Sequence, residues 1–479
     1  YLVFPDGSRS YFPTRAPKTL KFANEANDTK DIYARLYSDG VVSTINGLFL
    51  PRYGMGNYIS PKAKANATEA ETKQIQDLSR AGKILMGFCR TNLFKRLESS
   101  GYSFLLSIER HILRNYIFLY AIENGLPLPI GSQGAEMLDD RFYDGDADRQ
   151  SVVGNLFEDD DDSSTEVESA TEMSCELYSE AYFMERAKKV YGEYSGQYKR
   201  RFSWIQTKLF APKLKKHLQD DIVALSSVLE HCKSWNPGSD EKLNELEHLI
   251  QQKHRHEKIL VFTQFADTAL YVTQQLKKRG VTKIAAVTGD SQDPTELAWR
   301  FSPKSNGKST GPDAIDKDQE LRILIATDVL SEGQNLQDAH IVVNYDLPWA
   351  IIRLIQRAGR VDRIGQESDN ILCYSFLPAD GVEKIIKLRS RVQDRLKQNA
   401  EVVGTDEAFF EDEDSQSVLN LYNEEAGILD GEADEEVDLA SYAYQIWKQA
   451  IEQDKSLEKT IPALPSVVFS AKKATTDQQ

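Results

Sequence analysis

Cysteine is scarce in this sequence, which has 479 residues and only 4 cysteines. They stand at positions 89, 175, 232 and 373, too far apart for a disulfide framework or a zinc knuckle. Long apolar runs are also missing, since no window reaches the roughly 18 uncharged apolar residues of a membrane-spanning helix. We therefore expect a cytoplasmic protein in a reducing compartment, with no membrane partner.

Clusters of metal ligands are lacking too. His254 and His256 stand close together, but without the further nearby ligands that a zinc site needs. We therefore expect no metal held by the side chains of this chain alone.

Acidic residues exceed basic ones, giving a net charge of −16, but their distribution is uneven. Residues 136–180 carry −14 and residues 401–440 carry −15, which leaves the rest of the chain at +13. That balance is compatible with a polyanion as partner. The acidic segments lack periodicity, so the first is expected to be a mobile loop and the second part of a loose tail.

The chain is long enough for several domains, and its pattern changes along the sequence. Residues 1–40 suggest an extended connection or the trailing edge of a preceding domain. Residues 41–235 show mainly helical periodicity, interrupted by the acidic loop 136–180. Residues 236–400 alternate short apolar runs with helical segments, and residues 401–479 form an acidic tail with one expected helix at 440–453.

Five apolar runs in the third segment predict buried strands, at residues 258–262, 283–289, 322–328, 340–346 and 371–377. Most are followed by a segment of helical periodicity. Near-continuous apolar strands that alternate with helices are typical of a parallel sheet covered on both faces. The predicted fold class is α/β, with a parallel-sheet domain that follows a large, mainly α-helical region.

Polar residues gather where these predicted strands end. Thr327 and Asp328 follow one strand, and the helix after another leads into "QRAGRVDRIGQ", which contains Arg360 and Arg363. Ligands of open parallel sheets bind at this edge, where a planar guanidinium can bridge two phosphate oxygens. As an isolated pattern, the two arginines could equally form surface ion pairs with Asp362 or Glu367.

Three segments together resemble a known family. "KILVFTQF", "RILIATDVLSEGQNLQDAHIVVNYDLPW" and "QRAGRVDRIGQ" are similar in order and spacing to motifs IV, V and VI of superfamily 2 helicases. The "DRIGQ" ending most resembles SWI/SNF-type DNA translocases of the bacterial RapA type. The resemblance implies a RecA-like second lobe, which closes on ATP and Mg²⁺ bound mainly by a first lobe and steps along double-stranded DNA.

The resemblance also implies roles for single residues. Arg360 and Arg363 would be arginine fingers, with Gln356 helping to orient them. The nucleotide would be lined by Asp328, Gly333 and Gln334, and the nucleic-acid backbone by Thr288, Gly289 and Thr327. The chain departs from the family after "DLPW", where Ala350 and Ile351 replace the usual Asn-Pro.

A basic, aromatic stretch at residues 186–217 gives two interpretations. Its tyrosines, Phe202 and Trp204 could pack inside a helical bundle, which would leave Lys199, Arg200 and Arg201 on a solvated face. Alternatively, these three cations could contact phosphates of nucleic acid directly. Both interpretations can hold at once.

The sequence lacks a convincing phosphate-binding loop. Such a loop needs Gly-x4-Gly-Lys-Ser/Thr after a buried strand, whereas "SPKSNGKSTG" has Ser302 in the leading position and no strand before it. A DExx box is also missing upstream. We therefore expect the C-terminal half of a two-lobe motor, inactive by itself, which acts with a first lobe and with DNA and, by resemblance, with bacterial genome-maintenance or defence proteins.

Two other function classes remain open. A non-catalytic nucleic-acid-binding or regulatory module could keep the same fold without turnover, although it would not need two arginines at the strand edge. An RNA helicase is the third possibility, and the "DRIGQ" ending is unlike that group.

Overall fold

The structure is a computed structural model. It describes residues 2–3, 9–10, 13–22, 32–65, 67–68, 71–73, 75, 78, 82–130, 179–196, 198–232, 235–289, 291, 293–328, 335–348, 351–363 and 366–377. The chain divides into two units, Tyr1–Asn423 and Glu424–Gln479, and all described residues belong to the first. The expected acidic tail 401–479 and nearly all of the expected acidic loop 136–180 lie outside the described residues.

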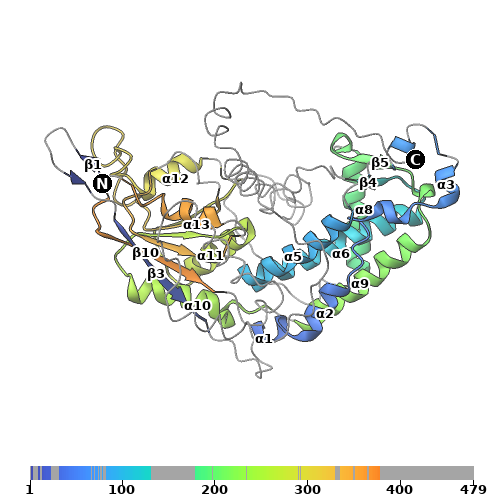
Figure 1. Ribbon diagram of the computed structural model, residues 1–479, viewed down its shortest axis with the longest axis horizontal. Helices are drawn as coiled ribbons and strands as arrows, with labels where there is room; N and C mark the ends of the chain where they lie inside the picture. The colour runs from blue at the N-terminus through green and yellow to red at the C-terminus, as the bar shows by residue number, and fades with distance from the viewer. Residues whose placement is uncertain are drawn as a thin grey trace, which may run out of the picture. The chain divides into compact units, whose positions relative to one another are not determined.

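A six-stranded sheet forms the centre of the α/β domain, with strand order β3-β10-β9-β6-β8-β7 (Figure 1). Every neighbouring pair in it is parallel. The predicted parallel sheet is thus confirmed, and all five predicted strands are present. The strands are β3 (Thr14–Leu20), β6 (Ile259–Phe262), β7 (Ile284–Val287), β8 (Ile323–Ala326), β9 (Ile341–Asn344) and β10 (Asn370–Phe376).

Both faces of the sheet are buried, which explains why the strands have continuous apolar sequences. Successive side chains point to opposite faces, so Ile259 and Val261 belong to one apolar cluster and Leu260 and Phe262 to another. Helices α10 (Glu241–His248) and α11 (Ala266–Lys278) pack in the first cluster, and α12 (Pro294–Phe301) packs in the second. A further helix, α13 (Ile351–Ala358), follows β9.

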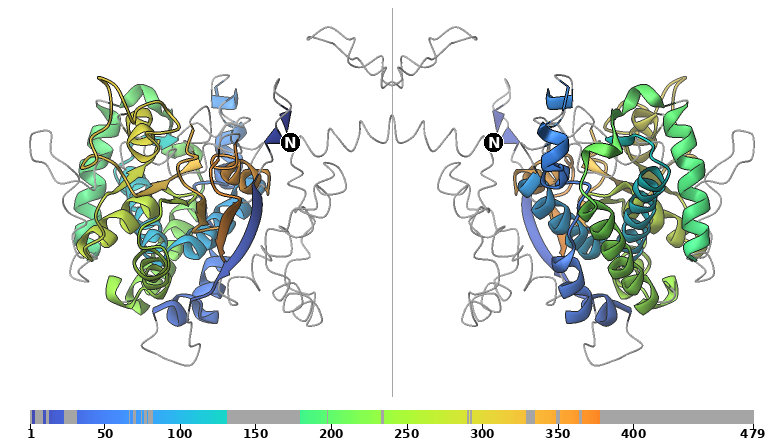
Figure 2. Two further views of the ribbon diagram at one scale, coloured as in Figure 1. Left: turned by 90° about the vertical axis from the view of Figure 1, so that its left-hand side faces the viewer. Right: turned by 90° about the vertical axis from the view of Figure 1, so that its right-hand side faces the viewer.

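Strand β3 was not predicted, because residues 1–40 suggested only extended connections. It pairs in parallel with β10 over all seven residues, from Thr14 opposite Asn370 to Leu20 opposite Phe376 (Figure 2). Its sequence contains Pro17, which is tolerated here because β3 is an edge strand. This part of the N-terminal segment therefore completes the sheet of the α/β domain.

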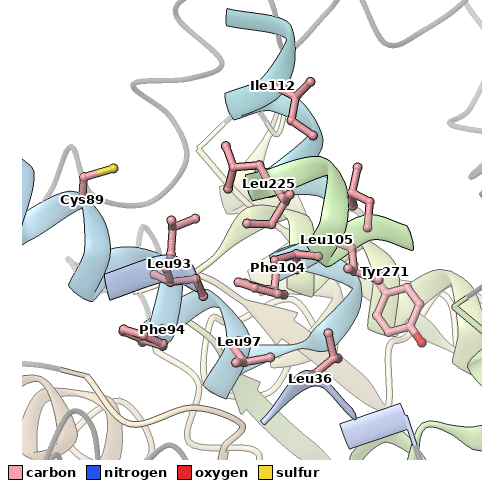
Figure 3. Close-up of a cluster of buried hydrophobic side chains, with 14 of the residues drawn as sticks. Leu36, Cys89, Leu93, Phe94, Leu97, Phe104, Leu105, Ile112, Leu225 and Tyr271 are labelled. Carbon is pink, nitrogen blue, oxygen red and sulfur yellow. The ribbon is translucent and has the colours of Figure 1, made fainter. Parts of the chain in front are cut away.

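The helical region consists of long helices, as the periodicity predicted. Helix α6 (Gly101–Glu123) packs against α5 (Gly82–Ser99), α8 (Glu180–Ser195) and α9 (Lys213–His231). Leu93, Phe104 and Leu225 meet between them, and Tyr271 of α11 lies at the edge of the same group (Figure 3). The helical region and one face of the sheet therefore share a single apolar core.

Shorter elements complete the described part of the chain. They are β1 (Leu2–Val3), β2 (Arg9–Ser10), α1 (Ile32–Leu36), α2 (Asp39–Gly47), α3 (Pro61–Ala65), β4 (Leu128–Ile130) and β5 (Ser203–Ile205), with 3-10 turns at Met55–Tyr58, Lys199–Arg201, Thr207–Leu209 and Pro237–Ser239 and a π-helical turn at Leu249–Lys253. Among the described residues, no helix is long and apolar enough to cross a membrane.

A buried carboxylate joins the helical region to the α/β domain. Asp267, in the first turn of α11, accepts hydrogen bonds from Arg110 of α6 at 2.6 and 3.2 Å and from Arg96 of α5 at 3.0 Å. All three side chains are at most 7% exposed. Burial removes the water that would otherwise solvate each charged group. The carboxylate and the two guanidinium groups are therefore stable only while all three are present.

Replacement of Asp267 by Asn should therefore lower the free energy of unfolding by about 3–5 kcal/mol, since it leaves two arginines buried without their carboxylate. The measurement is urea denaturation of wild type and variant. Glu367→Gln is the matched control, because its pair with Lys304 is 64% and 75% exposed, and should cost roughly 0–1 kcal/mol. Equal effects of the two substitutions would contradict this role for Asp267.

Candidate functional site at the carboxyl ends of the strands

The carboxyl ends of the parallel strands bring a set of threonines to one edge of the sheet. Thr263, Thr288 and Thr327 directly follow β6, β7 and β8, and each is at most 3% exposed. The backbone N–H of Thr327 donates to Val287 O at 2.9 Å, which extends the sheet by one residue. Two of the residues predicted to contact nucleic acid, Thr288 and Thr327, therefore stand on neighbouring strands at this edge.

Thr327 has an unusual feature at this edge. Its side-chain oxygen is buried and makes no hydrogen bond within the described part of the chain. Buried hydroxyls without a partner are rare in folded proteins. Thr288 by contrast is held in a turn, since its N–H donates to Ser291 Oγ at 2.9 Å, and Gly289 beside it is exposed.

Asp328, the next residue after Thr327, is held by two arginines of α13. Arg357 binds its carboxylate through two hydrogen bonds, of 2.7 and 3.1 Å, and Arg353 adds one of 3.1 Å. Residues four apart lie on the same face of a helix, so both arginines reach one carboxylate. Burial raises the pKa of Asp328, but the two arginines outweigh it and hold the pKa below its ordinary value.

Arg357 also reaches the end of β9. Its Nη1 donates to Asn344 Oδ1 at 3.3 Å and to the backbone oxygen of Asp346 at 3.2 Å. One buried guanidinium therefore connects the ends of β8 and β9 to the helix that precedes "GRVDRIGQ". Arg357 was not among the residues predicted from the sequence, although an acidic residue after β8 and a basic residue on α13 could have suggested the pair.

The predicted arginines follow directly in the turn after α13. The backbone N–H of Arg360 donates to Arg357 O at 3.2 Å, and the backbone oxygen of Arg360 accepts from Leu336 N at 3.3 Å. The Arg363 guanidinium donates to Asn335 Oδ1. Gln356 lies on α13 and is exposed. The structure thus places Gln356, Arg360 and Arg363 within one short segment at the carboxyl edge.

The carboxylates that the alternative interpretation required are engaged elsewhere. Asp362 pairs with Arg15 of β3 at 2.8 Å, and Glu367 pairs with Lys304. Gln366 completes the turn by donating to three backbone oxygens, at 2.9, 3.0 and 3.1 Å. Asp362 and Gln366 therefore hold the edge strand and the loop itself.

Two predicted nucleotide contacts, Gly333 and Gln334, lie outside the described residues. The segment "SPKSNGKSTG" is described and follows helix α12 rather than a strand. Lys308 lies over the ring of Trp299 at 4.5 Å. The expectation that this segment is a loop between a helix and β8, and not a phosphate cradle, is consistent with this position.

The basic stretch of the helical region shows the aromatic packing of the first interpretation, and phosphate contact by its cations stays a prediction. Tyr191 and Tyr194 are buried, and Tyr194 packs against Phe202 with ring centroids 4.3 Å apart. Lys199 and Arg200, on the adjoining 3-10 turn Lys199–Arg201, are exposed. The aromatic residues therefore pack within the helical bundle, whereas Lys199 and Arg200 are exposed to solvent.

Comparison with known proteins assigns the sheet domain. Residues 241–365 match the family model described as helicase conserved C-terminal domain. Over this segment, which we call the helicase domain, the chain is similar to the C-terminal domain of helicases. Similar relatives include the uncharacterized ATP-dependent helicase YqhH of Bacillus subtilis, 32% identical over 136 residues, and the RNA polymerase-associated protein RapA of Vibrio atlanticus, 37% identical over 131 residues.

The chain spans less than a quarter of the length of these relatives. The match to YqhH covers 28% of this chain and 21% of the relative, and the match to RapA covers 27% and 12%. The C-terminal part of the Fun30 ATPase domain is 13% identical, with a TM-score of 0.36 over 86% of this chain and 97% of that structure. A DEAD box protein from Methanococcus jannaschii is 25% identical, with a TM-score of 0.23 over 31% and 37%.

The Asp328–Arg357 pair gives the helicase domain a testable pH dependence. Because the folded-state pKa of Asp328 is lowered, its stabilisation is complete above the unfolded pKa, about 3.9. It is lost as the pH falls through the lower folded-state value. At pH 7, Asp328→Asn should cost about 3–5 kcal/mol, since it leaves Arg357 buried without a charged partner.

The measurement is the free energy of unfolding of wild type and Asp328→Asn between pH 7 and pH 2. The difference between them should shrink as the acidic end is approached. Arg353→Gln is the control, because Arg353 makes a single hydrogen bond to Asp328. It should lower the free energy of unfolding at pH 7 by less than Asp328→Asn does. A difference that stays constant with pH would show that Asp328 does not contribute through its charge.

Proposed function

We propose that this chain supplies the C-terminal half of an ATP-dependent translocase of double-stranded DNA, with Arg360 and Arg363 as arginine fingers. The observation that carries the proposal is the turn after α13. It presents both arginines at the carboxyl edge of a helicase domain, while Arg357 and Gln366 fix its two ends. Such an arrangement suits the stabilisation of negative charge that develops on a phosphoryl group bound at a fixed position.

The chemistry of the edge fits the phosphates of ATP better than it fits a metal. ATP bound with Mg²⁺ would supply the phosphoryl group that is transferred to water. The carboxylate of Asp328 is engaged by Arg353 and Arg357, so we infer that Mg²⁺ is held mainly by the first lobe. Asp328, Gly333 and Gln334 remain proposed nucleotide-site residues, with Asp328 acting through Arg357.

Each proposed finger has a simple role. Arg360 and Arg363 would donate hydrogen bonds to oxygens of the transferring phosphoryl group and neutralise the charge that develops on it. Gln356, on the last turns of α13, would orient them. The DNA backbone would contact Thr288, Gly289 and Thr327, which follow the neighbouring strands β7 and β8.

In the complete two-lobe protein, Arg360→Lys or Arg363→Ala should lower kcat for ATP hydrolysis by about 10³-fold or more. Lysine keeps the charge of Arg360 but loses the planar fork that can hold two oxygens. DNA affinity without nucleotide should persist. The measurements are turnover and DNA affinity on the same variants. Arg300→Ala is the control, because Arg300 lies on α12 and donates to the backbone oxygen of Gln319 at 2.9 Å.

Three outcomes separate the possibilities. Lost turnover with intact DNA affinity supports the fingers. Intact turnover would make these arginines structural, and lost DNA affinity would assign them to the nucleic-acid path. If the complete protein shows no DNA-stimulated turnover at all, the chain is a non-catalytic module.

The exposed basic turn should contribute to DNA binding through phosphate contacts. Lys199, Arg200 and Arg201 are the proposed contacts, and each neutralised phosphate releases about 0.9 counterion. Lys199→Ala with Arg200→Ala should therefore make the salt dependence of duplex affinity shallower by up to about two counterions. Lys277→Ala with Lys278→Ala is the control, because it removes the same charge from the far end of α11. Identical slopes for the two double variants would assign Lys199 and Arg200 to a solvated face.

A further inference from the structure

The carboxyl end of helix α5 is buried at the same strand edge as the proposed fingers. Lys95, Glu98 and Ser99 are 0%, 2% and 0% exposed. Lys95 donates to Glu98 Oε2 at 2.8 Å, so the two charges compensate each other. Lys242 of α10 donates to the backbone oxygens of Glu98 and Ser99, at 2.6 and 3.0 Å. The end of α5 is thus fixed in the helicase domain by polar contacts.

Ser99 contacts the carboxylate that ends β9. Its Oγ donates to Asp346 Oδ2 at 2.6 Å. The same carboxylate accepts from Thr263 Oγ1 at 2.5 Å and from Gln264 N at 2.8 Å. Asp346 is fully buried, and hydrogen bonds to the charged form are what make such burial tolerable.

The next residue is held from the same side. Leu347 N donates to Glu98 Oε1 at 3.3 Å, and Leu347 O accepts from Lys95 and from Gln264, the latter at 2.7 Å. The short segment Asp346–Leu347 is therefore fixed by α5 through both its side chain and its backbone.

Arg357 holds this segment from the other side. Its Nη1 donates to the backbone oxygen of Asp346 at 3.2 Å, while its Nε and Nη2 donate to the carboxylate of Asp328. Three residues later along the chain comes Arg360, whose N–H bonds back to the oxygen of Arg357 at 3.2 Å. A continuous series of contacts thus runs from Ser99 through Asp346 and Arg357 to the turn with the proposed fingers.

We propose that Ser99 is a positioning residue for the arginine turn, acting through Asp346 and Arg357. This inference rests on the proposed function for its catalytic consequence, but its structural step concerns this chain alone. Loss of the Ser99 hydroxyl would leave Asp346 with fewer donors, loosen the segment Asp346–Leu347, and so release the backbone oxygen that Arg357 uses.

Ser103, in the first turn of α6, provides a matched control. It is as buried as Ser99, and its Oγ lies 2.8 Å from Thr268 Oγ1. Ser99 also contacts Thr268, at 2.9 Å. The two serines therefore share the contact with α11. Ser99 differs in its contact with Asp346 and in a longer one of 3.4 Å with Thr263, which itself binds Asp346, so a difference between the variants reports on the group around Asp346.

The first test measures amide hydrogen exchange of the isolated chain by mass spectrometry. Ser99→Ala should speed exchange across residues 351–363 by about 10-fold relative to wild type, because local opening becomes easier there. Ser103→Ala should leave that segment unchanged. Ser99→Cys, which keeps the volume and a weak donor, should give an intermediate rate. Equal exchange of residues 351–363 in Ser99→Ala, Ser103→Ala and wild type would overturn the proposal.

The second test uses the complete two-lobe protein. Ser99→Ala should lower kcat by about 10- to 100-fold, the scale of a small misplacement of a catalytic group, with little change in the KM for ATP. Ser103→Ala should retain wild-type kcat. An equal fall in both variants would show a merely structural role for Ser99. If Arg360→Lys leaves turnover intact, the proposed function fails, whereas the exchange result still decides whether Ser99 orders the turn.

Discussion

Burial of the Asp346 carboxylate is the constraint on which the arrangement of this protein depends. A charge removed from water must be compensated by hydrogen bonds, or it destabilises the fold by several kcal/mol. The donors come from Ser99 of the helical region and from Thr263 and Gln264 at the end of β6. Because no single element supplies them all, satisfying Asp346 requires the helical region and the sheet to be in one defined relation.

Other buried charges repeat the same principle along this boundary. Asp267 is shared by Arg96 and Arg110, and Asp240 accepts from the hydroxyls of Tyr33 and Tyr271 at 3.0 and 2.9 Å. Burial raises the pKa of Asp240, which its hydrogen bonds only partly offset. Apolar packing alone would tolerate small shifts between the helices and the sheet, whereas these directional contacts do not. They specify where the helices lie.

The sequence predicted the sheet because its strands are buried on both faces. Runs such as "ILVF" and "ILIA" are short and apolar, and their alternation with helical segments along the chain favours a parallel arrangement. Strand β3 escaped prediction because "TRAPKTL" is polar and contains a proline, and it becomes a strand through pairing with β10. Edge strands depend on their neighbour more than on their own composition.

Within the candidate site, the sequence pointed to residues that lie close together along the chain. It did not point to contacts between residues that are far apart along the chain. Arg360 and Arg363 are visible in one short motif. The contact between Ser99 and Asp346 joins residues 247 positions apart, and nothing in the local sequence of either residue indicates it. Long-range hydrogen bonds of this kind depend on how whole helices pack. Sequence periodicity predicts which face of a helix is buried, but not which residues that face contacts.

The motif "QRAGRVDR" contains arginines that differ in their surroundings in the structure. Arg357 is 2% exposed, and it donates hydrogen bonds to strand-end groups, including the bidentate contact with Asp328. Arg363 is only partly buried, and its guanidinium donates to a neutral amide, the side chain of Asn335. A guanidinium already bound to a carboxylate has little reason to exchange it for a phosphate, whereas one bound to an amide gains charge compensation by doing so. The arginine that holds the helix in place and the arginine proposed to contact a phosphate are therefore distinguished by the charge of their partners, although both occur in the same motif.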